Sequence, residues 1–194
     1  MIDRVDGSGG ERRQLFRSAI DRWIGRVVER TEERFAPRHY FRPPGALPEM
    51  GFLAACTRCG VCAEVCPASA IMTVRPEGGL AAGTPYLDPA VQPCVVCVDM
   101  PCAAACPTDA LSVPEHGWQG YRLGRLELIA ERCITFRGTA CTACADACPV
   151  GPAALAIDET GHPVIRQEGC VGCGICVRAC VTSPSSFVLT ALEG

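Results

Sequence analysis

Sixteen cysteines, arranged in four groups of four, constrain this chain of 194 residues more than any other feature. The first and fourth groups share the spacing C-x2-C-x2-C-x3-C, whereas one gap grows to four residues in the second group and to seven in the third. A proline follows each of the first three groups, and no cysteine is left over. The groups are Cys56, Cys59, Cys62, Cys66; Cys94, Cys97, Cys102, Cys106; Cys133, Cys141, Cys144, Cys148; and Cys170, Cys173, Cys176, Cys180.

Three chemistries use cysteines at this density. Disulfides fit poorly, because two-residue gaps repeated in register give poor bridging geometry. Structural zinc sites normally combine two well-separated pairs, whereas here four thiols crowd into each run. The C-x2-C-x2-C-x3-C-P run is the spacing that ligates 4Fe–4S clusters. The sequence therefore predicts four such clusters, with all sixteen cysteines as iron ligands.

Each group also predicts a local geometry. Three thiolates of a C-x2-C-x2-C loop wrap around one cluster, and the fourth cysteine ligates the other cluster of a pair. We expect that fourth cysteine to start a helix. Tight turns beside the ligands need residues that can adopt a positive φ, as glycine does. The sequence places glycines there at Gly60, Gly172 and Gly174.

Composition excludes several classes of protein. The chain has 18 basic and 21 acidic residues, so it lacks the basic surplus of a nucleic-acid binder. No apolar run approaches the roughly 18 residues of a membrane span. We find no glycine-rich nucleotide loop and no Ser-His-Asp arrangement, so we expect an electron carrier without a substrate site. His39, His116 and His162 are interpreted as structural or surface residues, because each group already has four cysteines.

The first 42 residues differ from the rest, since they carry 10 Arg and no Cys. Apolar residues recur in pairs every four positions and predict an amphipathic helix over 11–34. Such a helix would either pack on the cluster-binding body of the chain or act as a docking element for a partner or a membrane surface. Charges interrupt the run that follows Arg12-Arg13, so we read no export signal and expect a cytoplasmic protein, with a periplasmic one as the alternative. The proline-rich stretch 36–48 predicts a linker.

Short strands and turns follow the cysteine groups. The pattern predicts strands at 70–74 and 123–129 and a hairpin over 155–165. This pattern predicts two copies of the small α+β module of a two-cluster ferredoxin. One apolar residue behind each group is expected to seal a cluster from water, namely Ile71, Leu111, Leu155 and Phe187.

Spacing does not decide which groups pair. Consecutive pairing would join groups one with two and three with four, whereas nested pairing would join one with four and two with three. We favour nesting, because the two regular groups look like halves of one module. The nested clusters would be held by Cys56, Cys59, Cys62 with Cys180; Cys170, Cys173, Cys176 with Cys66; Cys94, Cys97, Cys102 with Cys148; and Cys133, Cys141, Cys144 with Cys106. The domains would be an arm and linker at 1–48, an outer module at 49–85 plus 159–194, and an inner module at 86–158.

The ordered set of four motifs resembles the NapG/MauM ferredoxin-type proteins of periplasmic nitrate reduction and methylamine utilisation, over about residues 52–190. The segment Arg42-Pro43-Pro44-Gly45-Ala46-Leu47 is more similar to the start of the NapF type. More distantly, the set resembles electron-transfer subunits of molybdenum oxidoreductases, in which clusters pair in the nested order.

The sequence and this resemblance predict a polyferredoxin-like protein that passes electrons singly through four clusters. The resemblance implies protein donors and acceptors within a larger, membrane-associated oxidoreductase, such as a quinol-oxidising or cytochrome subunit. The alternative function is a maturation factor that delivers clusters to a redox enzyme.

Overall fold

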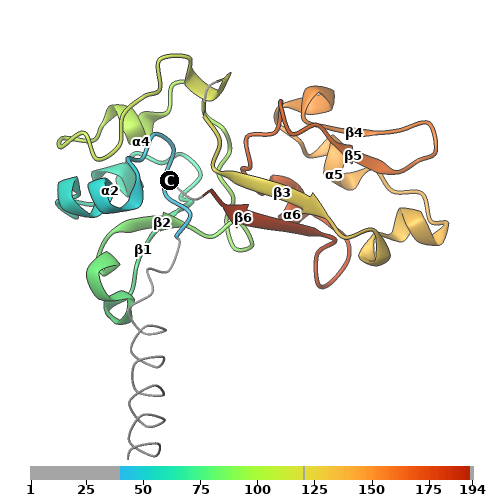
Figure 1. Ribbon diagram of the computed structural model, residues 1–194, viewed down its shortest axis with the longest axis horizontal. Coiled ribbons are helices and arrows are strands. Elements are labelled where there is room, and N and C mark those ends of the chain that lie inside the picture. The colour runs from blue at the N-terminus through green and yellow to red at the C-terminus, as the bar shows by residue number, and fades with distance from the viewer. Residues whose placement is uncertain (1–39, 120, 193–194) are drawn as a thin grey trace, which may run out of the picture. The chain divides into compact units, whose positions relative to one another are not determined.

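The computed structural model describes residues 40–119 and 121–192 (Figure 1). The helix predicted over 11–34 lies outside these residues. The α-helices are α2 (Glu49–Ala55), α3 (Val61–Glu64), α4 (Pro101–Ala104), α5 (Ala143–Asp146) and α6 (Ile175–Ala179). The 3-10 helices are η1 (Pro76–Ala81), η2 (Gly117–Gln119), η3 (Ala130–Arg132), η4 (Ile134–Arg137) and η5 (Gly151–Ala153). The strands are β1 (Ile71–Thr73), β2 (Pro85–Leu87), β3 (Gly124–Leu128), β4 (Leu155–Ile157), β5 (Pro163–Ile165) and β6 (Phe187–Ala191).

The strands form three two-stranded antiparallel sheets. β1 pairs with β2 and β4 pairs with β5, each as a local connection. β3 pairs with β6, which returns from much later in the chain to bring Leu128 opposite Phe187 (Figure 1). The mixture of short helices and sheets confirms the α+β class, and the three predicted strand regions all contain strands.

The strand pairing contradicts the nested modules. Under nesting, β3 and β4 belong to an inner module that ends at residue 158, and β5 and β6 belong to the outer one. In the structure, main-chain ladders join β3 to β6 and β4 to β5, across that boundary. Backbone hydrogen bonds of this kind hold a single module together. The outer and inner modules predicted at 49–85 plus 159–194 and at 86–158 are therefore wrong.

Two groups of buried side chains accompany these sheets. One surrounds Phe52, Met100 and Leu111, and it includes the buried thiols of Cys62 and Cys102. The other surrounds Leu126, Leu155 and Phe187, and it includes the thiols of Cys144 and Cys176. Cysteine side chains thus form part of each core rather than its rim.

The proline-rich segment is packed from residue 41 onward, so the predicted linker is wrong for its described part. Phe41 bridges Leu87, and Ala46 bridges Leu111. The buried Arg42 guanidinium forms a bidentate ion pair with Glu49, with N···O distances of 2.8 and 2.6 Å. Arg42 Nη1 also donates to Thr84 Oγ1 (2.9 Å) and to the Pro85 carbonyl (2.7 Å). This buried charge is tolerated because it is paired with a carboxylate and makes four hydrogen bonds.

Candidate metal centres

Four hollows in the described structure are each lined by four cysteines, and together they account for all sixteen. Three cysteines of every set come from one group and the fourth comes from the neighbouring group. We name the sets quartet I (Cys56, Cys59, Cys62, Cys106), quartet II (Cys94, Cys97, Cys102, Cys66), quartet III (Cys133, Cys141, Cys144, Cys180) and quartet IV (Cys170, Cys173, Cys176, Cys148).

These quartets correct the nested pairing. In the structure, each fourth cysteine lines the hollow of another group, and the exchange runs between groups one and two and between groups three and four. The physical reason is the backbone. The β3–β6 ladder brings the segment after Cys180 beside the segment that leads into Cys133, whereas nesting needs Cys180 beside Cys56.

The short helices set the local geometry of every quartet. The third cysteine of each group is the second residue of α3, α4, α5 or α6. Each helix ends before the fourth cysteine, which corrects the expectation that the fourth cysteine starts a helix. Left-handed backbone at Gly60 (φ 83°) and Gly174 (φ 82°) turns the chain into α3 and α6, a conformation that glycine adopts without steric cost.

Burial makes several of the thiols reluctant to ionise, because it raises their pKa values. It is the largest influence that raises the pKa of Cys62, Cys94, Cys102, Cys144 and Cys173 to about 11, and charge on neighbouring thiols adds to the rise. Four thiolates in one hollow would therefore need a cationic core to hold them together, because unpaired buried charges are costly.

The quartets follow one another in a single series. Charge on Cys62 of quartet I adds to burial in raising the pKa of Cys102 in quartet II. Charge on Cys94 of quartet II acts in the same way on Cys173 of quartet IV, which packs in the same core as quartets I and II. Charge on Cys144 of quartet III in turn raises the pKa of Cys176 in quartet IV, after burial and nearer thiols. The order along the molecule is therefore I, II, IV, III.

The apolar residues predicted behind the groups are all buried. Ile71 lines the hollow of quartet II, Leu111 that of quartet I and Phe187 that of quartet III. Leu155 lies in the core beside quartet IV, whose hollow is lined by the adjacent Ala154. Hydrocarbon therefore faces each hollow.

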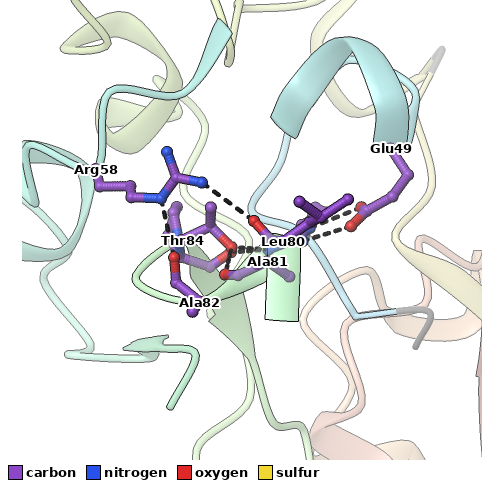
Figure 2. A network of polar contacts seen from close by, with 8 residues as sticks. Glu49, Arg58, Leu80, Ala81, Ala82 and Thr84 are labelled. Atoms are coloured by element: carbon purple, nitrogen blue, oxygen red, sulfur yellow. Dashed lines mark hydrogen bonds and ion pairs between the residues drawn. The ribbon is translucent and has the colours of Figure 1, made fainter. Parts of the chain in front are cut away.

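The exposed side chain of Arg58 anchors the loop that carries the first three cysteines of quartet I. Its Nε donates to the Ala82 carbonyl (2.9 Å) and its Nη2 to the Leu80 carbonyl (3.1 Å), which ties the loop to η1 (Figure 2). Thr84 Oγ1 accepts from Arg42 and donates to the Ala81 carbonyl (2.5 Å), which extends the network to Glu49 (Figure 2). The loop that carries Cys56, Cys59 and Cys62 is thus fixed to the packed segment at residues 41–49.

Quartet III carries polar neighbours that sequence reasoning missed. Thr135 Oγ1 lies 3.2 Å from Cys133 Sγ, and Thr182 Oγ1 lies 3.1 Å from Cys180 Sγ. The Ser186 N–H also donates to Cys180 Sγ (3.3 Å). Burial raises the pKa of Cys180, but these hydrogen bonds outweigh it and lower the pKa to about 7. The available sequence signal is a threonine two residues after a cysteine.

Residues 53–72 of the chain match the family model of the 4Fe-4S binding domain. The methylamine utilization ferredoxin-type protein MauM of Methylophilus methylotrophus is 34% identical over 189 residues, which cover 93% of this chain and 83% of that protein. The ferredoxin-type protein NapG of Escherichia coli K12 is 36% identical over 163 residues, which cover 78% of this chain and 71% of that protein.

The chain belongs to this MauM and NapG family of ferredoxin-type proteins. MauM of Paracoccus denitrificans is 36% identical over 148 residues, or 72% of this chain. The match spans 66% of that relative's length, just under two thirds. The family likeness inferred from the motifs is confirmed, and the match of residues 53–72 to the 4Fe-4S binding domain supports iron–sulfur binding by this chain.

The donor sets fit the 4Fe-4S binding domain that matches this chain. A cubane takes one thiolate on each of four irons, so its ligands surround a hollow rather than converge on a point. Within residues 40–119 and 121–192, no three Cys, His, Asp or Glu side chains are grouped closely enough to hold a single metal ion. None of the helices in this part of the chain has the length and apolarity needed to cross a bilayer.

Proposed function

We propose that the chain binds four 4Fe–4S clusters, one at each quartet, and carries electrons singly between protein redox partners. The observation that carries this proposal is the set of four hollows, each lined by four thiols. When bound, the clusters supply one-electron redox chemistry. Cys56, Cys59, Cys62 and Cys106 would hold the first cluster, and quartets II, III and IV would hold the others.

The chain's own residues would hold, insulate and space these centres. Apolar side chains such as Ile71, Leu111 and Phe187 restrict water at the hollows, and the exclusion of solvent helps to set a cluster's potential. The series I, II, IV, III supports a path with two ends, at quartets I and III. Cys59, the one exposed cysteine, belongs to quartet I and gives that end access to solvent.

Partners would be proteins that donate and accept electrons, as parts of a membrane-associated oxidoreductase with a quinol-oxidising or cytochrome subunit. The amphipathic pattern over 11–34 supports a docking role for the arm. We propose a cytoplasmic location and no substrate chemistry for the chain itself.

The decisive experiment is an EPR-monitored redox titration of anaerobically purified protein, with iron and acid-labile sulfide counted per chain. We expect about sixteen irons and sixteen sulfides, four of each per cluster, and four reversible one-electron waves. Zinc in place of iron would overturn the cluster proposal. Clusters that pass to an apo-acceptor on dilution would instead identify a delivery factor.

A further inference from the structure

The four quartets differ in the hydrogen bonds that reach their sulfur atoms. Quartet III has a hydroxyl close to two of its sulfurs, at 3.2 Å from Cys133 and 3.1 Å from Cys180. Quartet I has one hydroxyl, Thr108 Oγ1, at the longer distance of 3.8 Å from Cys106 Sγ. In quartet II, the Ala70 N–H donates to Cys66 Sγ at 3.4 Å. Among the described residues, side-chain donors therefore concentrate at quartet III.

His162 orients the first of these hydroxyls. Its Nδ1 lies 3.2 Å from Thr135 Oγ1, and its ring stacks on Phe136 with centroids 4.0 Å apart. A thiolate bound to iron can only accept, so the single hydroxyl proton of Thr135 must point to Cys133 Sγ. The hydroxyl oxygen must then accept from His162, so Nδ1 carries a proton in this contact.

Ser186 orients the second hydroxyl in the same way. Ser186 is completely buried, and its Oγ lies 2.9 Å from Thr182 Oγ1. Once Thr182 donates to Cys180 Sγ, its oxygen accepts from the Ser186 hydroxyl. The Ser186 N–H adds a further bond to the same sulfur. Each of the two sulfurs thus has a donor that another residue holds in place.

Such donors change the balance between oxidation states. One-electron reduction adds negative charge to the iron–sulfur core and its thiolates, so a fixed donor stabilises the reduced state more than the oxidised one. Burial strengthens the effect, because little water competes for the sulfur. Backbone donors also act at other quartets, as Thr108, Ala110 and Leu111 do at Cys106 of quartet I. The reduction potential is therefore expected to rise most where close hydroxyls add to such backbone donors, as at Cys133 and Cys180.

Two arginines compete with these donors, and neither is buried. The Arg58 guanidinium beside quartet I bonds the carbonyls of Cys56, Leu80 and Ala82 rather than a sulfur. Burial raises the pKa of Cys170 in quartet IV and the positive charge of Arg122 opposes that rise, while the Arg122 guanidinium bonds the carbonyls of Gln167 and Glu168. Solvent and salt screen charges at the surface far more than a buried hydrogen bond. Quartets I and IV therefore gain less than quartet III.

Resting on the proposed function, we propose that Thr135 and Thr182, positioned by His162 and Ser186, give the cluster of quartet III the highest reduction potential of the four. Electrons that enter the chain would then settle first at this end. His162 and Ser186 act as positioning residues, since they reach the sulfurs through the threonines.

The test is the redox titration of full-length, cluster-loaded Thr135→Val, with Thr135→Ser as the matched variant that keeps the hydroxyl. We expect Thr135→Val to move only the most positive of the four waves, and to move it downward. The shift should be about 59 mV, which is a tenfold change in a one-electron equilibrium. Thr135→Ser should leave that wave near its original position. Thr108→Val is the matched variant at quartet I. Because its hydroxyl lies farther from the sulfur, at 3.8 Å, we expect it to leave the most positive wave in place and to shift another wave by less than Thr135→Val shifts its own.

His162→Phe and Thr182→Val provide independent variants should Thr135→Val lose its cluster. Each is expected to lower the same wave, His162→Phe by less than Thr135→Val, because it removes only the orienting donor. For these quartet III variants, a downward shift of any wave other than the most positive overturns the inference, as does a response in several waves or identical behaviour of Thr135→Val and Thr135→Ser. Wild-type protein with fewer than four clusters would instead overturn the proposed function.

Discussion

Quartets I and III, the two ends of the series, support their sulfurs in different ways. At quartet I the regular C-x2-C-x2-C loop is held by Arg58, an exposed residue that bonds backbone carbonyls. At quartet III the sulfurs themselves accept hydrogen bonds from buried groups, including Ser186. The comparison shows that the cysteine spacing positions the ligands, whereas other residues set the polarity around their sulfur atoms.

In quartet III, the longer gap between Cys133 and Cys141 supplies such a polar residue. Its seven-residue gap forms η4 and turns at Gly138, where φ is 84°. This 3-10 turn carries Thr135, the residue that reaches Cys133 Sγ. The stretched motif is therefore more than a tolerated insertion, because it adds a donor that the regular loop lacks.

Removal of iron should abolish the difference between the two ends entirely. Chelation under reducing conditions is expected to unfold both, because cysteine side chains form part of each core and a site of this kind couples metal binding to folding. Circular dichroism should show loss of secondary structure, and all sixteen thiols should become reactive. Native-like dichroism with thiols still protected at one end would show that this end folds without its cluster.

Paired cysteine substitutions test which sulfurs belong to each end. The double variant Cys133→Ala/Cys180→Ala removes two ligands of quartet III, so we expect the loss of one cluster, about four irons per chain. Cys56→Ala/Cys180→Ala removes one ligand each from quartets I and III, so about eight irons should be lost. Iron and sulfide analysis checks both numbers, and the reverse pattern would restore nested pairing.

Gly172 and Gly60 allow a matched comparison of how closely the backbone is packed beside quartets IV and I. A Cβ on Gly172, beside quartet IV, would clash with the Gly124 backbone, and the φ of Gly172 is 68°. Gly172→Ala should therefore lower the free energy of unfolding by about 3 kcal/mol through overpacking and left-handed strain. Gly60→Ala at quartet I meets nothing within 4 Å and should cost only about 1 kcal/mol.

Anaerobic urea titrations, followed by cluster absorbance, measure both glycine variants. The midpoint for Gly172→Ala should fall well below that for Gly60→Ala. Equal urea midpoints for the two variants would mean that Gly172 and Gly124 are less closely packed than in the structure.

The smallest effect is expected at Arg58. Arg58→Gln removes hydrogen bonds to η1, but the side chain is exposed, so the free energy of unfolding should fall by about 1 kcal/mol or less. The absorbance of the quartet I cluster should bleach faster in air, since its loop is no longer tied down. Arg125→Gln, which loses only an exposed ion pair with Glu127 at 3.4 Å, serves as the control. Equal bleaching of the two variants would argue against the anchoring role of Arg58.

The sequence predicts the local elements of this fold well. Cysteine spacing identifies the three-thiol loops, and alternation with turn residues predicts β1, β3 and the β4–β5 hairpin. These features depend on contacts within a few residues. The similarity between the spacings of groups one and four does not reveal pairing, because pairing depends on β6 returning to β3 across many residues.

Other features escape sequence reasoning because their partners are distant in the chain. Arg42 lies in a proline-rich stretch typical of a linker, and only the fold brings Thr84 and Pro85 to it. His162 lies 27 residues from Thr135, and no spacing rule connects them. The hydroxyls beside Cys133 and Cys180 could have been suspected from a threonine two positions along, but not their orienting groups.

The pairing of neighbouring cysteine groups also affects when each quartet becomes complete during translation. Quartets I and II take all eight thiols from residues 56–106, so their ligand set is complete once that stretch has left the ribosome. Nesting would have kept Cys56 waiting for Cys180, the last cysteine of the four groups. Since domains fold as units, N-terminal first, the first pair of centres can be assembled and shielded from oxygen while the segment that carries quartets III and IV is still being translated.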